Sequence, residues 1–415
     1  MYSGHFLYIW SLMDIRVTLL LAADAAFALV LLYSSGVLKS SGAAVAAALL
    51  AAGAFFVRWL MLDYASLDYL DFLTKWVQYF ADNGGFRALS GSVGNYNIPY
   101  LYFLAWFSYS DIDDLYLIKL LSIFFDVVLA WASMQLCGLF VKSAGRKLAC
   151  FFIVLFLPTV LLNGAYWGQC DSIYAAFAVM SIYLALDGKP SLAMAAIAAA
   201  FAFKLQAVFV MPVFAVMLMS GNVKLRHFLI FPAVYILMVL PAVLLGRPFM
   251  ETLTLYFSQA GSIGGGLNYN SSSIFSLMPN ADKTTWSKLG VVLAFAAMIA
   301  VLLTAFIKRR GLNRRAVFAA AVLMAVMIPF LLPHMHDRYF FCADILTLVL
   351  ACITPERAFL PCFVQFGSLL GYYAFLKMQF LLPMRYGGLA MLLAVIAAAA
   401  YFLLSFSKNK ERLPC

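Results

Sequence analysis

The sequence LDYASLDYLDFLTKWVQYFADNGGFRALSGSVGNYNIPYL, residues 62–101, is a long polar break in a chain that is otherwise almost continuously apolar. Four aspartates lie in it, Asp63, Asp68, Asp71 and Asp82, although only 11% of the 415 residues are charged. Polar groups beside a bilayer are costly unless they face water or a ligand, so this stretch is a candidate functional site. The alternative is an acidic connector that is simply solvated.

The composition excludes an ordinary soluble globular protein, because 65% of the residues are hydrophobic and the mean hydropathy is +0.95. We therefore predict an all-α polytopic integral membrane protein. The net charge of +10 could suggest a nucleic-acid partner, but the Lys and Arg residues cluster in short loops between apolar segments. That clustering is the positive-inside pattern, so we expect membrane lipids as partners and no nucleic acid.

A helix needs about 20 mainly apolar residues to cross the hydrocarbon region of a bilayer. On this scale we predict about eleven crossings, near residues 14–35, 42–62, 115–140, 147–163, 171–187, 225–245, 289–307, 316–332, 338–353, 358–382 and 388–407. Two more apolar segments do not fit as simple crossings. Residues 98–109 are too few, and residues 191–219 are broken near Lys204 and Gln206.

The basic loops decide the topology, because residues 142–147, 224–227, 308–315 and 408–412 are all expected on the cytoplasmic side. This arrangement requires that residues 98–109 do not cross and that residues 191–219 form a re-entrant helical hairpin. The N-terminus is then outside and the C-terminus inside. We treat residues 1–415 as one transmembrane domain with two long outer loops, residues 63–114, which carry interfacial helices, and residues 246–288.

The same topology places every chemically interesting loop on the outer face. Besides the two long outer loops, these are residues 163–171 and residues 333–339. The charge rule used none of those residues, so their convergence is a consequence rather than an assumption. We therefore expect a multi-pass protein of the plasma or inner membrane with its active site on the extracytoplasmic face.

Asp68 is the first candidate for chemistry. A partly desolvated carboxylate at the membrane surface could accept a proton from an incoming hydroxyl. Alternatively, Asp68 caps the helix that follows it. That helix carries Phe72, Trp76, Val77 and Phe80 at helical spacing, which predicts an amphipathic helix in the interface with its apolar side in lipid.

Trp167, Gln169 and Asp171 form a short polar turn with Asn163. A tryptophan at the membrane interface is more often an anchor than a ligand. Asp171 could cap the span that begins there. The presence of several polar residues in one short turn favours a functional interpretation.

Lys204 lies with Gln206 inside a hydrophobic run. A buried lysine is expensive, so we expect an anionic partner, which is either a protein carboxylate or a bound phosphate. Lys119, near the outer end of its span, could instead extend to the interface and need no function.

His334, His336, Asp337 and Arg338 come together between two predicted spans. Two histidines and an aspartate suggest a metal, but this set does not make a zinc site without further ligands. Arginine with histidine suits a phosphate better, since a guanidinium binds two phosphate oxygens at once. A local Asp337–Arg338 ion pair that ends a helix is the remaining alternative.

The outer loop 246–288 holds a glycine run, residues 261–266, followed by Asn268 and Asn270, whose amides could hydrogen-bond sugar hydroxyls. No GxxxxGK(S/T) phosphate loop is present in the sequence, so a nucleoside triphosphate is not an expected fuel.

Five motifs, in their order and spacing, carry a family resemblance. They are Ser66-Leu67-Asp68-Tyr69 leading to Trp76 and Gly84-Gly85-Phe86, then Asn95-Tyr96-Asn97-Ile98-Pro99-Tyr100, Tyr166-Trp167-Gly168-Gln169-Cys170-Asp171, Lys204-Leu205-Gln206, and Pro333-His334-Met335-His336-Asp337-Arg338-Tyr339-Phe340. Together they resemble the bacterial mannosyltransferase-like branch of the GT-C glycosyltransferase superfamily, over about residues 55–400. One proline of the family's Tyr-Pro-Pro element is missing here, and the span at 14–35 is an addition to the simplest members.

The resemblance implies a GT-C-like fold and a reaction. Such enzymes transfer a sugar from a polyprenyl-phosphate carrier on the outer face of the membrane, with inversion at the anomeric carbon. The implied donor is a polyprenyl-phosphate hexose, mannose being only the family's label. The acceptor is an unknown glycan, lipid or protein, and we expect no cofactor and no metal.

The resemblance also implies roles for residues. Asp68 is the catalytic base, with Asp71 in reserve. The donor phosphate would be bound by Lys204, His336, Arg338 and Tyr339. The predicted substrate-binding residues are Trp76, Asn95, Tyr96, Tyr100, Trp167, Gln169, Asp171, Gln206, His334, Asn268 and Asn270.

Two other classes of protein remain open. A transporter or flippase of lipid-linked sugars would also need an outward polar cavity and buried charge, although the sequence has no convincing inverted repeat. A non-catalytic subunit of an envelope assembly is the other alternative, and the presence of both Asp68 and Arg338 argues mildly against it.

Overall fold

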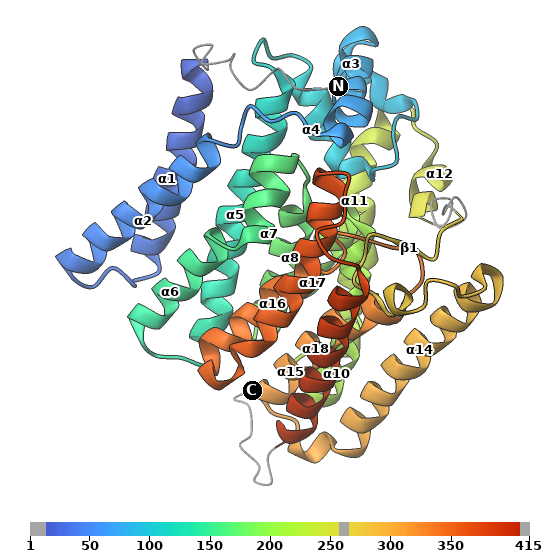
Figure 1. The fold of residues 1–415 in the computed structure, drawn as a ribbon. Coiled ribbons are helices and arrows are strands. Elements are labelled where there is room, and N and C mark those ends of the chain that lie inside the picture. Colours follow the sequence, from blue (N-terminus) through green and yellow to red (C-terminus); the bar gives the residue numbers. More distant parts are fainter. Residues whose placement is uncertain (1–13, 257–264, 407–415) are drawn as a thin grey trace.

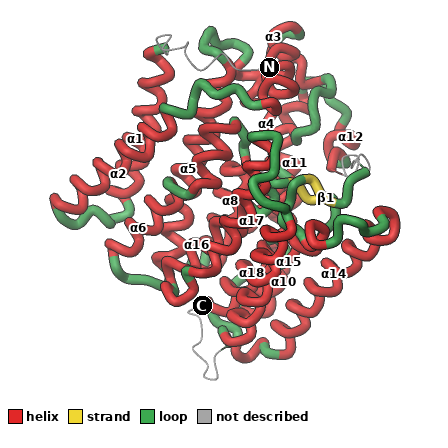
Figure 2. Tube along the Cα trace, viewed as in Figure 1, coloured by secondary structure: helices red, strands yellow, loops and turns green. Residues whose placement is uncertain are grey.

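The computed structural model describes residues 14–256 and 265–406, and this part of the chain is almost entirely helical (Figure 1, Figure 2). Residues 1–13, residues 257–264 of the predicted outer loop and its glycine run, and the basic tail with Lys408, Lys410 and Arg412 lie outside the described residues. The predicted class, an all-α polytopic membrane protein, is confirmed.

The longer helices include one at each predicted span and four others, α3, α4, α9 and α10. They are α1 (Ile15–Ser34), α2 (Ser41–Trp59), α3 (Thr74–Asp82), α4 (Ile98–Phe107), α5 (Asp114–Gly138), α6 (Ala144–Leu155), α8 (Asp171–Leu186), α9 (Pro190–Phe203), α10 (Val213–Ser220), α11 (Ile230–Leu244), α14 (Lys283–Ile307), α15 (Arg314–Leu331), α16 (Phe341–Ile353), α17 (Phe359–Leu376) and α18 (Arg385–Leu404).

Shorter elements connect them. These are α7 (Pro158–Leu161), α12 (Phe249–Leu253), the π-helices η1 (Tyr69–Leu73) and η3 (Leu162–Trp167), the 3₁₀-helices η2 (Gly85–Ser90), η4 (Leu205–Phe209), η5 (Leu225–Leu229), η6 (Ile274–Leu277), η7 (Arg309–Gly311) and η8 (Pro355–Arg357), and the strands β1 (Asn268–Tyr269) and β2 (Met335–His336). The pair α1–α2 lies at one side of the bundle and α14 at the other (Figure 1).

Each predicted span overlaps a helix, but the helices differ in length and the span at 147–163 is divided between α6 and the segment after it. Within the described ranges, eight helices are long and apolar enough to cross a membrane, and a ninth is obtained if α6 and the following segment Pro158–Trp167, bent by 45°, count as one span. The predicted spans at 171–187 and 338–353 correspond to α8 and α16, which have only 16 and 13 residues. The count of eleven crossings therefore stays a prediction.

The chain between α8 and α11 turns back on itself. The α9 helix ends before Lys204, whose backbone is extended, and α10 then returns toward the end of α8. There the Asn222 side chain donates a hydrogen bond to the Ala185 carbonyl (3.4 Å). A bent helical pair thus occupies the predicted hairpin segment, and its re-entrant path through a membrane stays a prediction.

Lys119 is completely buried, so the prediction that it extends to the interface was wrong. Its ammonium donates hydrogen bonds to the carbonyls of Met61, Leu62 and Tyr64 at 2.9, 2.8 and 2.7 Å. These carbonyls belong to the turn that follows α2, and a buried ammonium requires such hydrogen-bond acceptors. Lys119 therefore links α5 to this turn and holds the chain a few residues before Asp68.

The amphipathic helix predicted after Asp68 forms as α3, but its apolar side does not lie in lipid. Trp76, Val77 and Phe80 are buried against the neighbouring α4 and η2. Phe72 lies one turn earlier, in η1, and is half exposed. The polar stretch is therefore packed onto the protein, which gives its side chains defined positions.

A second buried charge connects four helices. The Arg58 guanidinium donates two hydrogen bonds to Asp126 Oδ2 (2.9 and 3.2 Å) and one to the Leu155 carbonyl (3.0 Å). Ser172 donates to the other Asp126 oxygen. All these groups are fully buried, so neither charge has access to water.

We expect that Asp126→Leu destabilises the protein by roughly 3–5 kcal/mol, because it leaves the Arg58 charge buried without a partner. The double variant Arg58→Leu/Asp126→Leu removes both charges and should recover more than half of the loss. Thermal unfolding in detergent, compared across the wild type, both single variants and the double variant, measures this. Additive losses in the double variant would contradict it.

Candidate functional site

Both π-helices of the described chain border the same polar cluster. η1 begins directly after Asp68, and η3 ends at Trp167. π-Helical turns are rare and occur often at functional sites. Gly168 follows η3 with φ of +82°, a left-handed conformation that glycine adopts without cost. The turn reverses the chain so that Trp167 and Gln169 face Asp68.

Asp68 is held by one of its oxygens. Its Oδ2 accepts hydrogen bonds from Trp167 Nε1 (2.9 Å) and Gln169 Nε2 (2.6 Å), and Arg338 Nη1 lies 3.9 Å away. Its side chain makes no capping hydrogen bond to η1, so the capping interpretation was wrong. Oδ1 accepts no hydrogen bond from the residues that the structure describes, and the side chain is 19% exposed. One oxygen thus orients the carboxylate and the other is free for a ligand.

Asp171 is the partner that Lys204 was expected to need. The Lys204 ammonium donates to Asp171 Oδ1 (2.5 Å), and Asn163 Nδ2 donates to Oδ2 (2.8 Å). Asp171 is the first residue of α8, but its side chain does not cap that helix, contrary to prediction. The bend after α9 places the lysine here. Of the two anionic partners considered for Lys204, the protein supplies a carboxylate.

Arg338 lies between three carboxylates. Its nitrogens lie 3.9 Å from Asp68, 3.6 Å from Asp171 and 3.7 Å from Asp337. Its guanidinium also lies 5.3 Å from the ring centroid of Trp167, within range of a cation–π contact. Among the described residues, none of these contacts is a hydrogen bond, and Nε, although 3.6 Å from Asp171, has no hydrogen-bond partner. The guanidinium is therefore charge-compensated but retains hydrogen-bonding capacity.

An aromatic wall lies beside this cluster. The Tyr96 hydroxyl donates to Gln169 Oε1 (2.9 Å), and the Lys204 ammonium is 5.3 Å from the Tyr96 ring centroid. Tyr96 packs against Trp76 (5.5 Å) and Tyr100 (4.9 Å). The predicted residues of the outer loop 63–114 therefore meet those of the 163–171 turn.

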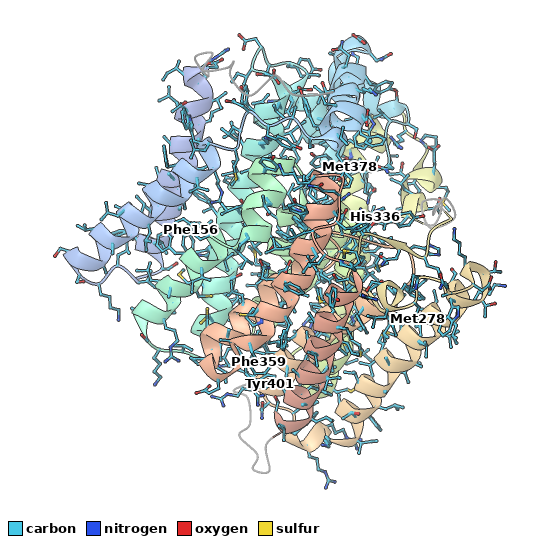
Figure 3. The ribbon with its side chains drawn as sticks, in the orientation of Figure 1. Phe156, Met278, His336, Phe359, Met378 and Tyr401 are labelled. Carbon is cyan, nitrogen blue, oxygen red and sulfur yellow. The ribbon has the colours of Figure 1, made fainter. Side chains whose placement is uncertain are left out.

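The strands β1 and β2 attach the second long outer loop to the site. They pair in parallel, with Tyr269 opposite His336, and the two rings stack with centroids 4.7 Å apart. The His336 ring also lies 5.1 Å from that of Tyr339. His336 is labelled beside the helical bundle in Figure 3.

Two groups in the segment 336–338 have displaced pKa values. Burial, followed by the charges of Arg338 and Lys204, lowers the pKa of His336 to about 4, so its ring is neutral at pH 7. Burial raises the pKa of Asp337 to about 7, the nearby Asp68 charge adds to this, and Arg338 opposes it.

Some predicted residues lie outside the cluster. Asp71 is exposed and 3.9 Å from Lys75. Both ring nitrogens of His334 are engaged within the protein, with the Gly266 carbonyl (2.6 Å) and Ser287 Oγ (2.8 Å). Asn268 hydrogen-bonds the Ser271 backbone through both its amide atoms.

Three other predicted residues lie near the cluster. Gln206 is buried, and its Oε1 has no hydrogen-bond partner among the described residues. Asn270 forms a backbone bridge with His336. Asn95 is exposed beside Tyr96.

Sequence reasoning missed two supporting residues. Tyr372 of α17 accepts a hydrogen bond from Asn163 Nδ2 (3.0 Å) and contacts Trp167 edge-on (5.3 Å). Phe375, one turn later, stacks on Trp167 at 4.5 Å. Both lie in an apolar span, where nothing but their aromatic character distinguishes them from core residues.

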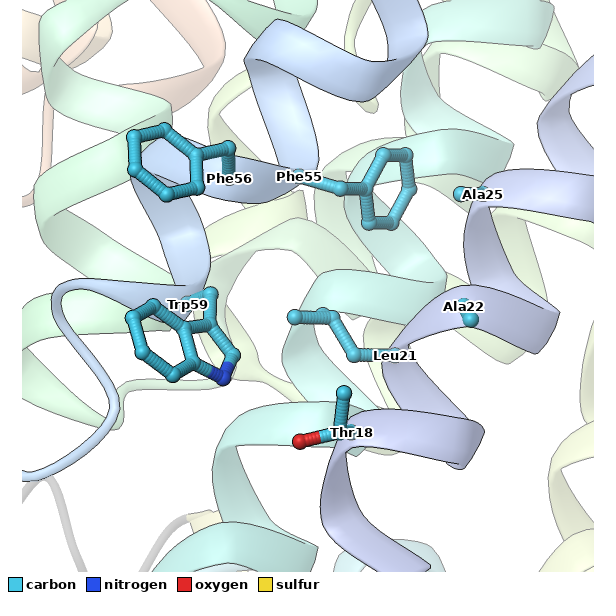
Figure 4. Close-up of a pocket in the computed structure, with 7 residues that line it drawn as sticks. All are labelled: Thr18, Leu21, Ala22, Ala25, Phe55, Phe56 and Trp59. Atoms are coloured by element: carbon cyan, nitrogen blue, oxygen red, sulfur yellow. The ribbon is translucent and has the colours of Figure 1, made fainter. Parts of the chain in front are cut away.

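An apolar cavity of about 380 Å³ lies elsewhere, between α1 and α2 (Figure 4). Its lining residues are Thr18, Leu21, Ala22, Ala25, Phe55, Phe56 and Trp59. None of them belongs to the polar cluster. Within the described residues, no three His, Cys, Asp or Glu side chains are grouped to hold a metal ion.

In comparisons with known proteins, no protein-family model matches the chain and no curated protein matches it. A functional proposal must therefore be argued from the residues of the site.

We expect the pKa of His336 to make the fold sensitive to acid. Below about pH 6.5 the unfolded chain takes up a proton at this residue, whereas the folded protein does so only near pH 4. Folding stability should therefore fall by up to about 1.4 kcal/mol per pH unit in that window. His336→Phe keeps a ring to stack on Tyr269 and cannot titrate. Melting temperatures at pH 7.5 and pH 5 should differ less for this variant than for the wild type, and equal differences would contradict the assignment.

Proposed function

We propose that this protein is an inverting GT-C-type glycosyltransferase that moves a hexose from a polyprenyl-phosphate carrier to an acceptor hydroxyl. The reaction would take place on the extracytoplasmic face of the plasma or inner membrane. The proposed topology has eleven crossings and one re-entrant hairpin, with the polar cluster on the outer side.

One observation supports the proposal more than any other. Asp68 has one oxygen fixed by two N–H donors and the other free of hydrogen bonds to the described residues, beside Arg338 and the Asp171–Lys204 pair. A general base must be oriented toward the proton that it removes. Buried cations near it are what a reaction with a phosphate leaving group requires.

The mechanism follows from these positions. Asp68 Oδ1 accepts the proton of the acceptor hydroxyl as that oxygen attacks the anomeric carbon. The bond from this carbon to the phosphate oxygen breaks on the opposite side, and its electrons remain on the phosphate. Negative charge grows there in the transition state, where stabilisation by Arg338 and Lys204 accelerates the reaction.

The buried carboxylate of Asp171 has a supporting role in this scheme. It holds Lys204 at hydrogen-bonding distance and lies 3.6 Å from Arg338. A lysine without an anionic partner at this depth would be costly to keep charged. Asp171 therefore keeps the site folded and charged before donor binds.

Asp68→Asn separates transfer from transport. The amide cannot accept the proton, so turnover should fall by at least about 100-fold while donor binding changes little. The measurement is transfer of radiolabelled sugar from a panel of polyprenyl-phosphate hexoses by purified protein in nanodiscs. Asp71→Asn is the matched control, because it removes an exposed carboxylate three residues away and should retain activity.

Equal activity of the wild type and Asp68→Asn would remove Asp68 as the base. Movement of labelled lipid across vesicles by both proteins, without a transfer product, would favour a transporter or flippase of lipid-linked sugars. Absence of donor binding across the whole panel would overturn the proposed donor class.

A further inference from the structure

Asp337 is a buried carboxylate that the proposed mechanism does not use. The residue is 3% exposed, and its Oδ1 has no hydrogen-bond partner among the described residues. The same oxygen lies 3.7 Å from Arg338 Nη1. Buried carboxylate oxygens are normally hydrogen-bonded, so an unpaired one beside an arginine requires an explanation.

The backbone around Asp337 leaves little room for movement. A Cβ at Gly371 of α17 would lie 3.1 Å from Asp337 Cβ and 2.5 Å from the Asn270 carbonyl oxygen. The helix therefore lies directly against this residue, and only glycine fits there. Because rotation of the Asp337 side chain is restricted, we expect this residue to respond to a change in nearby charge by gaining or losing a proton.

Charged groups face Asp337 from several elements. Arg338 is on its own segment, Asp68 precedes η1, and Asp171 begins α8. Lys204 pairs with Asp171, and α17 contributes the buried Tyr372.

The histidine beside Asp337 adds no charge, since the pKa of His336 is lowered to about 4. Three carboxylates and two cations then give the cluster one negative charge when all are ionised, and none when Asp337 is protonated.

We propose that Asp337 is a positioning residue that binds a proton when the phosphate of the donor enters beside Arg338. This inference rests on the proposed function. A phosphodiester brings one negative charge into a site that already holds three carboxylates, and the two cations, Arg338 and Lys204, cannot compensate all four. Asp337 is the carboxylate nearest Arg338 Nη1, at 3.7 Å against 3.9 Å for Asp68. Its protonation removes that charge, so the guanidinium becomes available to the phosphate.

The electrostatics agree with this role. Burial already raises the pKa of Asp337 to about 7, so its proton is exchanged in the physiological range. Coupling between two sites is reciprocal, so a bound anion favours the protonated form and the protonated form favours the anion. Raising the pH above 7 removes this proton and weakens phosphate binding.

The test uses the full-length protein in nanodiscs and a probe with a constant charge. The methyl ester of a polyprenyl phosphate is a phosphodiester and keeps one negative charge from pH 5 to pH 9, whereas the monoester titrates near neutral pH. Binding to the wild type should weaken by up to about tenfold per pH unit above pH 7. The side chain of Asp337→Asn is neutral at every pH, so the affinity of this variant for the diester should change by no more than about twofold over the same pH range. Asp82→Asn is the control, because it removes an exposed carboxylate at the end of α3, and it should follow the wild type.

The same pH dependence in the wild type and Asp337→Asn would overturn this inference and leave the proposed donor class intact. No binding of the diester to the wild type at any pH would overturn both. A second measurement avoids any folding defect of the variant. Calorimetry of diester binding to the wild type at pH 7.5, in buffers of different ionisation enthalpy, should report uptake of a fraction of a proton, and zero uptake would overturn the role of Asp337.

Discussion

The Arg338 guanidinium sets the constraint on which the polar cluster of this structure depends. A cation that is only 17% exposed requires compensating charge, and the protein supplies it from three carboxylates on separate segments, Asp68, Asp171 and Asp337. Removing the partner of a buried charge destabilises a protein far more than removing the partner of an exposed one. The segments must therefore meet around the arginine, although their residues are up to 270 positions apart in the chain.

The approach of these segments to Arg338 depends on backbone features that regular helical bundles lack. Two π-helical turns and the left-handed Gly168 orient Asp68 and Trp167 toward each other. The bend at Lys204 ends α9 where Asp171 begins α8. Lys119 holds the turn after α2, a few residues before Asp68, through three carbonyls.

Much of this was predictable from the sequence, because helices that cross a bilayer need long apolar runs and polar loops stand out against them. The convergence of residues 62–101, 163–171 and 333–339 follows from the distribution of basic residues. The sequence does not reveal whether a side chain caps a helix or crosses to another segment, since both choices use the same residue types. The side chains of Asp68, Asp171 and His334 reach other segments, whereas Asn268 bonds within its own loop. Tyr372 and Phe375 carry no polar signal, so their contact with Trp167 depends on the register of α17.

The helix α17 forms a common back wall for both halves of the site. Phe375 and Tyr372 pack on Trp167, whose indole nitrogen binds Asp68 and whose ring lies under Arg338. One residue before Tyr372, Gly371 lies against Asp337. The proposed base and the proposed phosphate-binding cation therefore rest on the same two turns of one helix. Displacement of α17 would change both positions together, so the geometry of acid–base chemistry and of phosphate binding is coupled through packing as well as through charge.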